Sequence, residues 1–192
     1  MHIENKIKKS LNTVNSNIES SNGLPNKFYT SKEIFEYEKE TVFSNNWCGI
    51  AFGSDIPDVG DIKALEFLSI PLIVVRTEKE QIQVFENVCR HRGMILVEEN
   101  AKHKKHIRCP YHNWCYGIDG KLVSTPHVGG IGRHSHKDVK KNELGLNKVR
   151  SHVWNDTIFI NITGNALTFD NHFSRLKKRW SDFDQPMFFG GN

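Results

Sequence analysis

Long hydrophobic runs are missing from the sequence. The most apolar stretch, residues 70–75, contains a proline and is far shorter than the roughly 18 residues that a membrane span requires. The first ten residues contain no apolar segment of the kind that a secretory signal needs. These two absences predict a cytoplasmic location and no contact with a membrane.

The sequence also lacks a strong excess of charge, because 26 lysines and arginines accompany 22 aspartates and glutamates. The net charge is +4, and the basic residues are scattered along the chain. This pattern predicts a solvated surface and argues against binding to nucleic acid. Internal repeats and a Gly-rich phosphate loop are absent as well, which argues against repeat folds and nucleotide-phosphate sites.

Cysteine is scarce, and its four positions are Cys48, Cys89, Cys109 and Cys115. Structural disulfides are uncommon in a reducing cytoplasm, so each cysteine is expected to bind metal, to react or to fill a core position. The spacing of cysteine relative to histidine has to decide between these roles.

Short apolar runs separated by turn residues dominate residues 47–162 and predict a mostly antiparallel β architecture. Asp119-Gly120 predicts a hairpin turn, and Asn155-Asp156 lies between two alternating runs that predict another. The expected strands cover residues 47–52, 62–68, 72–76, 81–84, 116–118, 121–123, 149–153 and 158–162.

The chain before this β region is of two kinds. Residues 1–27 have few large apolar side chains, so we expect a flexible N-terminal segment. Residues 31–43 carry spaced apolar side chains that predict a short amphipathic helix. Thr30 and Glu33 match a capping box at its start.

Cysteine and histidine come together between residues 87 and 122. Cys89-x-His91 is followed, after seventeen residues, by Cys109-x-x-His112, so each short loop offers one thiolate and one imidazole. Zinc accepts two sulfurs and two nitrogens, but common zinc modules pair Cys with Cys and His with His. The order Cys, His, Cys, His favours a two-iron cluster with unlike irons. A zinc module used for binding stays open as an alternative.

The pattern C-x-H-x₁₇-C-x-x-H, within CRHRG and CPYHNWCY, resembles the Rieske [2Fe–2S] motif. It is similar in particular to α subunits of Rieske-type non-haem iron oxygenases, which include ring-hydroxylating dioxygenases and choline or carnitine monooxygenases. The resemblance spans about residues 28–180. It implies a Rieske-type antiparallel β sandwich with a cluster-binding subdomain and short N- and C-terminal helices. It also implies one [2Fe–2S] cluster per chain, with Cys89 and Cys109 on one iron and His91 and His112 on the other.

Several neighbours of these residues bear on the resemblance. Respiratory Rieske proteins usually carry an extra cysteine in each ligand loop, joined as a disulfide, and the first loop here has none. Cys115 is therefore expected to be a small buried thiol, and Cys48 to be similar. Trp114 is expected to shield the cluster. The family often has glycine where Asn113 stands, a departure that could alter the backbone angles of the loop.

The sequence lacks the second metal site of such oxygenases. Their mononuclear Fe(II) is held by two histidines and a carboxylate in a domain that follows the Rieske domain. After residue 162 only His172 remains, so no catalytic residue is predicted in this chain. An experimental truncation, a truncated gene and a true single-domain protein are all open explanations.

The expected organisation has three parts. Residues 1–27 form the flexible segment, residues 28–165 the Rieske domain, and residues 166–192 a helix and tail leading towards the absent catalytic domain. Asp170 is the expected cap of this last helix. The side chains expected on its apolar face are Phe173, Leu176 and Trp180.

The resemblance implies an oxidoreductase that passes single electrons from a flavin- or ferredoxin-type reductase to the mononuclear iron site of an aromatic-ring or quaternary-amine oxygenase. The catalytic oxygenase domain or subunit and a homotrimer are the other implied partners. Some of the lysines could dock an acidic redox partner. The alternative is an independent Rieske ferredoxin-type carrier, but the helix at residues 31–43 favours the oxygenase. The substrate is not encoded in this chain.

Five histidines outside the two pairs are expected to lie in exposed loops, whereas His2, His152 and His172 are isolated in the sequence. His103 and His106 lie between the pairs, and three others lie in the glycine-rich stretch TPHVGGIGRHSH. A second metal site at His127, His134 and His136 is the less favoured alternative.

Overall fold

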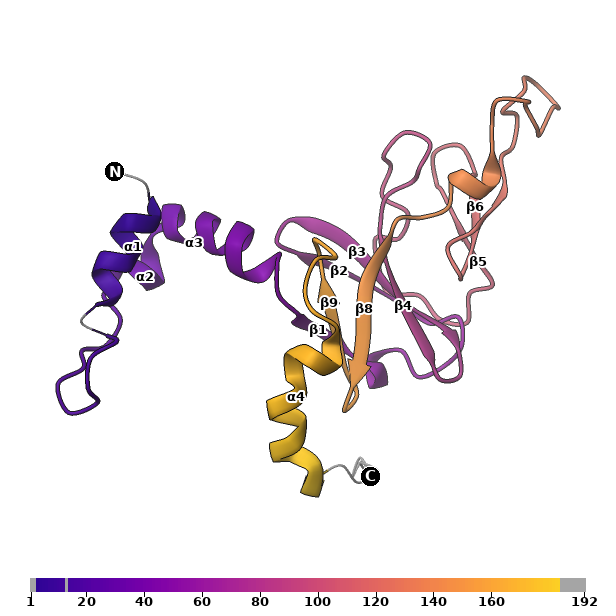
Figure 1. Cartoon of the computed structure of the whole chain (residues 1–192). Coiled ribbons are helices and arrows are strands. Elements are labelled where there is room, and N and C mark those ends of the chain that lie inside the picture. The colour runs from indigo at the N-terminus through magenta and orange to yellow at the C-terminus, as the bar shows by residue number, and fades with distance from the viewer. Residues whose placement is uncertain (1–2, 13, 184–192) are drawn as a thin grey trace. The chain divides into compact units, whose positions relative to one another are not determined.

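The computed structural model describes residues 3–12 and 14–183 (Figure 1). The chain divides into two compact units, a helical one at residues 1–46 and a larger one at residues 47–192. All the strands that the structure describes belong to the larger unit. Among the described residues, no helix combines the length and apolar character needed to cross a bilayer.

The helical unit begins with a helix that the sequence analysis did not predict, α1 (Ile3–Leu11). Its few apolar residues, Ile3, Ile7 and Leu11, recur every four positions and therefore share one face. An ion pair of 2.6 Å between Glu4 and Lys8, one turn apart, supports the same helix. The regular spacing of the apolar residues therefore accounts for this helix better than their low number does.

The predicted helix at residues 31–43 is present as α3 (Lys32–Glu38), which continues into a π-helical turn, η1 (Lys39–Phe43). The predicted capping box at Thr30 is wrong. The cap is Ser31, whose hydroxyl accepts the Ile34 N–H at 3.4 Å. Thr30 instead ends the short helix α2 (Lys27–Thr30), and its hydroxyl donates to the Asn26 carbonyl at 3.2 Å.

The larger unit contains two antiparallel sheets, which confirms the predicted mostly β fold class. The six-stranded sheet has the order β1-β9-β8-β4-β3-β2, and the three-stranded sheet has the order β5-β6-β7. The strands are β1 (Cys48–Phe52), β2 (Ile62–Phe67), β3 (Ile70–Glu78), β4 (Gln81–Glu86), β5 (His106–Arg108), β6 (Cys115–Gly117), β7 (Leu122–Ser124), β8 (Lys148–Trp154) and β9 (Thr157–Asn161).

Strand β3 is buried on both faces and separates two hydrophobic cores. Leu72 and Val74 belong to the core of the six-stranded sheet, which also contains residues of β1, β8 and β9. Ile73 and Val75, on the opposite face, belong to a core shared with the three-stranded sheet and with both predicted cysteine ligands. The strand's unbroken apolar run follows from this double burial.

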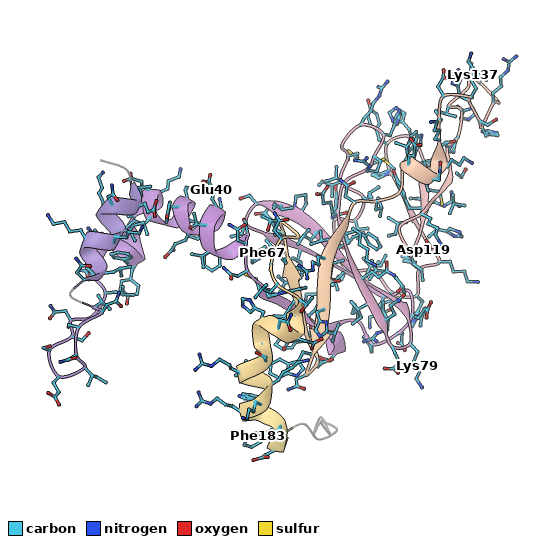
Figure 2. All side chains as sticks on the ribbon, in the orientation of Figure 1. Glu40, Phe67, Lys79, Asp119, Lys137 and Phe183 are labelled. Carbon is cyan, nitrogen blue, oxygen red and sulfur yellow. The ribbon has the colours of Figure 1, made fainter. Side chains whose placement is uncertain are left out.

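Both predicted hairpin turns are confirmed. Strands β6 and β7 pair across Asp119-Gly120, with Tyr116 opposite Leu122. Asn155 and Asp156 join β8 to β9 with φ values of 47° and 62°, the left-handed conformation that tight hairpin turns favour. Figure 2 shows Asp119 in its turn and Lys137 at the tip of the long connection between β7 and β8.

The C-terminal helix α4 (Phe169–Trp180) is confirmed, but Asp170 is not its cap. The Thr168 hydroxyl accepts the Asn171 N–H at 3.4 Å. The helix packs through stacked aromatic rings, with Phe169 and His152 centroids 4.0 Å apart. The part of the predicted tail beyond Phe183 lies outside the described residues.

Candidate metal centre

The first ligand loop is a tight turn closed by its own backbone. The Cys89 N–H donates to the Met94 carbonyl at 2.8 Å, and the Gly93 N–H donates to the Cys89 carbonyl at 3.0 Å. Gly93 has φ 73°, which is in the left-handed region that glycine adopts without strain. His91 therefore lies at the tip of the turn, within the segment that these two hydrogen bonds close.

The second loop repeats this geometry at the same spacing. The Cys109 N–H donates to the Trp114 carbonyl at 2.8 Å, and the Asn113 N–H donates to the Cys109 carbonyl at 3.0 Å. Asn113 has φ 57° and takes the place of Gly93 in the first loop. Because asparagine tolerates the left-handed region, the departure from glycine leaves the loop intact.

The two loops bring their cysteines together in a buried core. Cys89 is 2% exposed and Cys109 is 1% exposed. Burial raises the pKa of the Cys109 thiol, and the hydrogen-bonded Cys89 side chain raises it further. The backbone N–H groups of Tyr111 and His112 donate towards the same sulfur and lower that pKa. These donors would stabilise negative charge on the sulfur once its proton is displaced by a metal.

The two histidines form a second pair. The ring centroids of His91 and His112 lie 4.8 Å apart, with their planes at 70°. The Nδ1 atoms of both rings are buried and have no hydrogen-bond partner among the described residues. Burial lowers the pKa of His91, and the charges of His112 and Arg92 lower it further, which keeps the imidazole neutral and its lone pair available.

This donor set fits a two-iron cluster with unlike ends. A buried nitrogen without a partner costs about 1–3 kcal/mol, and a metal ligand bond removes that cost. Within the described ranges, no three His, Cys, Asp or Glu side chains converge on one ion position. The four donors are arranged instead as a pair of thiols and a pair of imidazoles. A Rieske [2Fe–2S] cluster takes two cysteines and two histidines.

An aromatic ring covers each imidazole. Trp114 is 5% exposed and stacks on His91, with centroids 4.6 Å apart and planes at 7°. This is the position expected of a shielding side chain. Tyr111 lies over His112 at 3.8 Å and is 59% exposed. One imidazole is therefore shielded by a buried ring, and the other by a ring at the surface.

Tyr116 is a site residue that the sequence analysis missed. Its hydroxyl lies 3.3 Å from the Cys89 sulfur and accepts the backbone N–H of Arg90 at 3.0 Å. The oxygen thus has a donor, and its own hydrogen is free to point at the sulfur. Burial raises the pKa of Tyr116 well above its usual range, so the hydroxyl keeps that hydrogen.

Asn87 is a second missed residue, and it positions the first loop. Its amide nitrogen donates to the Val97 carbonyl at 2.6 Å. Its side-chain oxygen accepts the N–H groups of Leu96 and Val97 at 3.2 and 3.0 Å. Asn87 is 3% exposed and precedes Cys89 by two residues, so these bonds fix the chain on both sides of the loop.

The other predicted positions fall largely as expected. Cys115 is 2% exposed and packs in β6, whereas Cys48 is half-buried. Burial raises the pKa of the Cys48 thiol. His103 and His106 are exposed, but His106 begins β5, a strand that the sequence analysis read as loop.

The glycine-rich loop arranges its histidines for hydrogen bonding. The Nδ1 atom of His127 accepts the Gly132 N–H at 2.9 Å, and that of His134 accepts the His127 N–H at 3.2 Å. The Nδ1 atom of His136 accepts the Asp138 N–H at 3.3 Å. A neutral imidazole that binds metal through Nε2 carries its hydrogen on Nδ1, so these bonds oppose a second metal site.

Comparison with known proteins finds relatives of this chain among oxygenase subunits. The α subunit of 2-aminobenzenesulfonate 2,3-dioxygenase from an Alcaligenes species is 32% identical over 153 residues, which are 79% of this chain and 38% of that protein. The oxygenase subunit of carnitine monooxygenase from Escherichia coli K12 is 31% identical over 80% of this chain and 40% of its own length. The chain therefore spans about two fifths of these relatives.

Solved structures agree with the sequence comparison. Naphthalene 1,2-dioxygenase from a Rhodococcus species has a TM-score of 0.78 with 28% identity, covering 91% of this chain and 38% of that one. A quaternary ammonium Rieske monooxygenase in complex with γ-butyrobetaine has a TM-score of 0.71 with 27% identity, over 82% of this chain and 44% of that one. The model of the Rieske [2Fe–2S] domain matches residues 46–146, more than half of the 192 residues. The chain belongs to the family of Rieske [2Fe–2S] domains, whose cofactor is a [2Fe–2S] cluster.

Proposed function

We propose that Cys89 and Cys109 bind one iron of the cluster and that His91 and His112 bind the other. The observation that carries this assignment is the pair of buried Nδ1 atoms that have no partner among the described residues, in the same two loops as two buried thiols. The two loops have the same pair of backbone hydrogen bonds, which supports the assignment. Each loop therefore presents one thiol and one imidazole in the same local geometry.

The surrounding side chains prepare this site for one-electron chemistry. When bound, a Rieske cluster takes up and releases one electron, at a potential of roughly −150 to +300 mV. Neutral His91 keeps the charge at its end of the site low. The Tyr116 hydroxyl and the N–H groups beside Cys109 stabilise negative charge at the sulfur end. Trp114 excludes water from the face of the His91 ring on which it stacks.

We further propose that the chain passes single electrons from a flavin- or ferredoxin-type reductase to the mononuclear iron of an aromatic-ring or quaternary-amine oxygenase. Relatives named as dioxygenase and monooxygenase subunits support this role. The catalytic domain or subunit would supply the oxygen-activating residues, and none is assigned to this chain. A homotrimer and a cytoplasmic location stay predictions.

The proposed domain division follows from the same role. Residues 28–165 would form the electron-transfer domain, with residues 1–27 before it and residues 166–192 leading to the catalytic domain. The family match at residues 46–146 lies within the proposed domain. The stacking of Phe169 on His152 supports an ordered start for the segment that follows.

Metal and sulfide analysis of the purified chain tests the cluster assignment directly. We expect two irons and two acid-labile sulfides per chain, as the [2Fe–2S] formula requires, and a visible absorption that dithionite bleaches. Reduced protein should give the electron paramagnetic resonance signal of a mixed Cys/His cluster. A colourless protein with one zinc and no sulfide would overturn the assignment.

Replacing Tyr116 by phenylalanine is expected to lower the midpoint potential. The variant keeps the buried ring but removes the hydrogen that points at the Cys89 sulfur, so the reduced cluster loses more stabilisation than the oxidised one. A differential hydrogen bond worth about 0.5–1.5 kcal/mol corresponds to roughly 20–65 mV for one electron. Redox titration followed by visible absorption measures the shift.

The matched control is Tyr111→Phe, because that hydroxyl belongs to an exposed ring over His112. Its potential should stay at the wild-type value. Equal shifts in both variants, or no shift in Tyr116→Phe, would contradict the role given to the buried hydroxyl.

A further inference from the structure

A groove of about 460 Å³ runs along β5, the edge strand of the three-stranded sheet. Its floor is apolar and is formed by Ile62, Leu96 and Ile107, which are all buried. Its rim contains the exposed basic residues Lys104, Lys105 and Arg108. An apolar centre surrounded by charged residues is the usual anatomy of a protein–protein interface.

The charges of this rim, which we call the β5 groove rim, are not neutralised by ion pairs within residues 3–12 and 14–183. None of the ion pairs in the described part of the chain involves Lys104, Lys105 or Arg108. The exposed carboxylates of Glu98 and Glu99 lie in sequence between the lining residues Val97 and Ala101, but they do not themselves line the groove. The rim therefore presents three positive charges to a partner, and it favours an acidic one.

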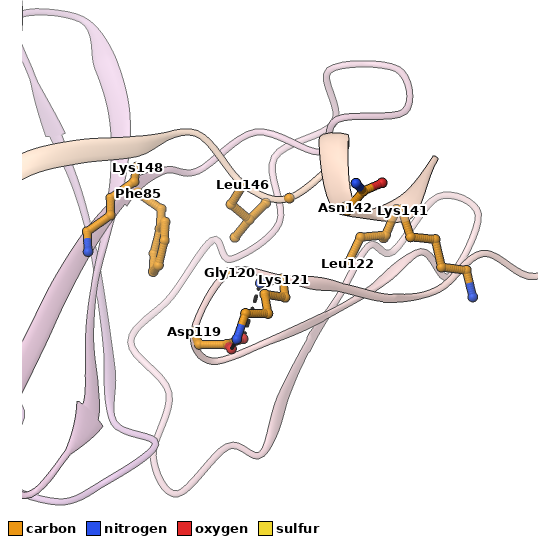
Figure 3. Close-up of a pocket in the computed structure, with 10 residues that line it drawn as sticks. Phe85, Asp119, Gly120, Lys121, Leu122, Lys141, Asn142, Leu146 and Lys148 are labelled. Carbon is orange, nitrogen blue, oxygen red and sulfur yellow. Dashed lines mark hydrogen bonds and ion pairs between the residues drawn. The ribbon is translucent and has the colours of Figure 1, made fainter. Parts of the chain in front are cut away.

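A second groove of similar size shows what distinguishes the first. It measures about 470 Å³ and has an apolar floor that includes Phe85 and Leu146 (Figure 3). Two of its lysines already have partners within the chain. Lys121 forms an ion pair with Asp119 at 2.9 Å, and Lys141 donates to the Val123 carbonyl at 3.2 Å. Groove volume and lysine content alone therefore do not single out the β5 groove.

The β5 groove is also connected directly to both cysteines of the metal centre. Arg108 is bonded to Cys109 through one peptide link. Ile107, in the floor, pairs across the sheet with Tyr116, whose hydroxyl touches the Cys89 sulfur at 3.3 Å. A molecule seated in this groove would contact residues that are linked to both cysteines, one by a peptide bond and the other through a strand pairing.

We propose that the β5 groove docks an acidic electron-transfer protein, which reduces the cluster through its cysteine end. This inference rests on the proposed electron-transfer function and adds the surface where the electron enters. The donor protein loses one electron and the cluster gains one, with no bond made or broken. A plant-type [2Fe–2S] ferredoxin, at about −400 mV, can supply that electron to a Rieske cluster.

The competing explanation is that these lysines only protect an exposed sheet edge. Charged side chains on an edge strand discourage pairing with other chains, and β5 is an edge strand of the three-stranded sheet. That explanation predicts no effect of the rim on reduction by a protein donor, so kinetics separate the two.

The test compares two charge reversals of equal size in the full chain. Lys104→Glu with Lys105→Glu changes the β5 groove rim, and Lys141→Glu with Lys148→Glu changes the groove of Figure 3. Stopped-flow absorption follows reduction of each oxidised cluster by a reduced, acidic plant-type ferredoxin at low and high salt. We expect the rate constant of the first variant to fall about tenfold at low salt, with a weaker salt dependence, and that of the second to stay within about twofold of wild type.

Two further measurements keep failure of this proposal separate from failure of the proposed function. Iron and sulfide content show whether each variant holds a cluster, and a mediated redox titration shows whether its potential is unchanged. If the wild type holds no cluster, the proposed function fails. If clusters and potentials match but the first variant reacts as fast as wild type, or both variants slow equally, the docking surface is wrong.

Discussion

Serine in place of Cys89 or Cys109 is expected to abolish the cluster. Iron–sulfur clusters need soft thiolate ligands, and a serine hydroxyl keeps its proton at neutral pH. Both sulfurs are buried, so water has little access to take their place as ligands. The variants should be colourless, with iron and sulfide near zero.

The same variants should also lose thermal stability, because a metal that binds only the folded chain stabilises it. Each variant should melt close to the temperature of wild-type protein stripped of its iron. Any additional loss should be about 1 kcal/mol, from the hydroxyl left in a buried position. Calorimetry of wild type, stripped wild type and both variants measures this comparison.

Cys115→Ala is the matched control. Cys115 is as buried as Cys89 and lies three residues beyond His112, but it is not one of the four assigned donors. Its variant should keep full iron and sulfide and lose only about 1 kcal/mol of stability through a small cavity. A coloured Cys89→Ser protein, or a colourless Cys115→Ala protein, would show that the ligands were assigned wrongly.

The four assigned donors were predictable from sequence because each loop is local. A thiol and an imidazole two or three residues apart share one tight turn, and the chemistry of the metal limits which residue types can stand there. Tyr116 and Asn87 were not predictable in this way. Tyr116 acts on a sulfur twenty-seven residues away in sequence, and only the pairing of the strands brings the two together.

The same distinction applies to the fold. The apolar runs of β3 and β8 and the turns at residues 119–120 and 155–156 were predictable because alternation and turn residues are local signals. Strand β5 has only three residues and depends on its pairing with β6, so no local sequence pattern predicted it. The two helix caps were displaced, to Ser31 and Thr168, because several polar residues near a helix start can serve as the cap and the tertiary structure selects one.

Exchanging His91 for cysteine is expected to lower the midpoint potential by on the order of 200 mV. A neutral imidazole is replaced by a thiolate, and the added negative charge destabilises the reduced cluster more than the oxidised one. The change moves the site part of the way towards an all-cysteine cluster, at about −400 mV. Redox titration of the purified variant, with electron paramagnetic resonance of the reduced state, measures both the potential and the ligand change.

Matched variants make this result specific to the imidazole pair. His112→Cys should shift the potential in the same direction, because the two rings form one pair with centroids 4.8 Å apart. His172→Cys makes the same exchange on the exposed surface of α4 and should leave the potential unchanged. His112→Ala removes a donor without replacing it and should prevent normal assembly. A wild-type potential in His91→Cys, or a normal red cluster in His112→Ala, would mean that these imidazoles do not bind the iron, and the buried Nδ1 atoms would then need another partner.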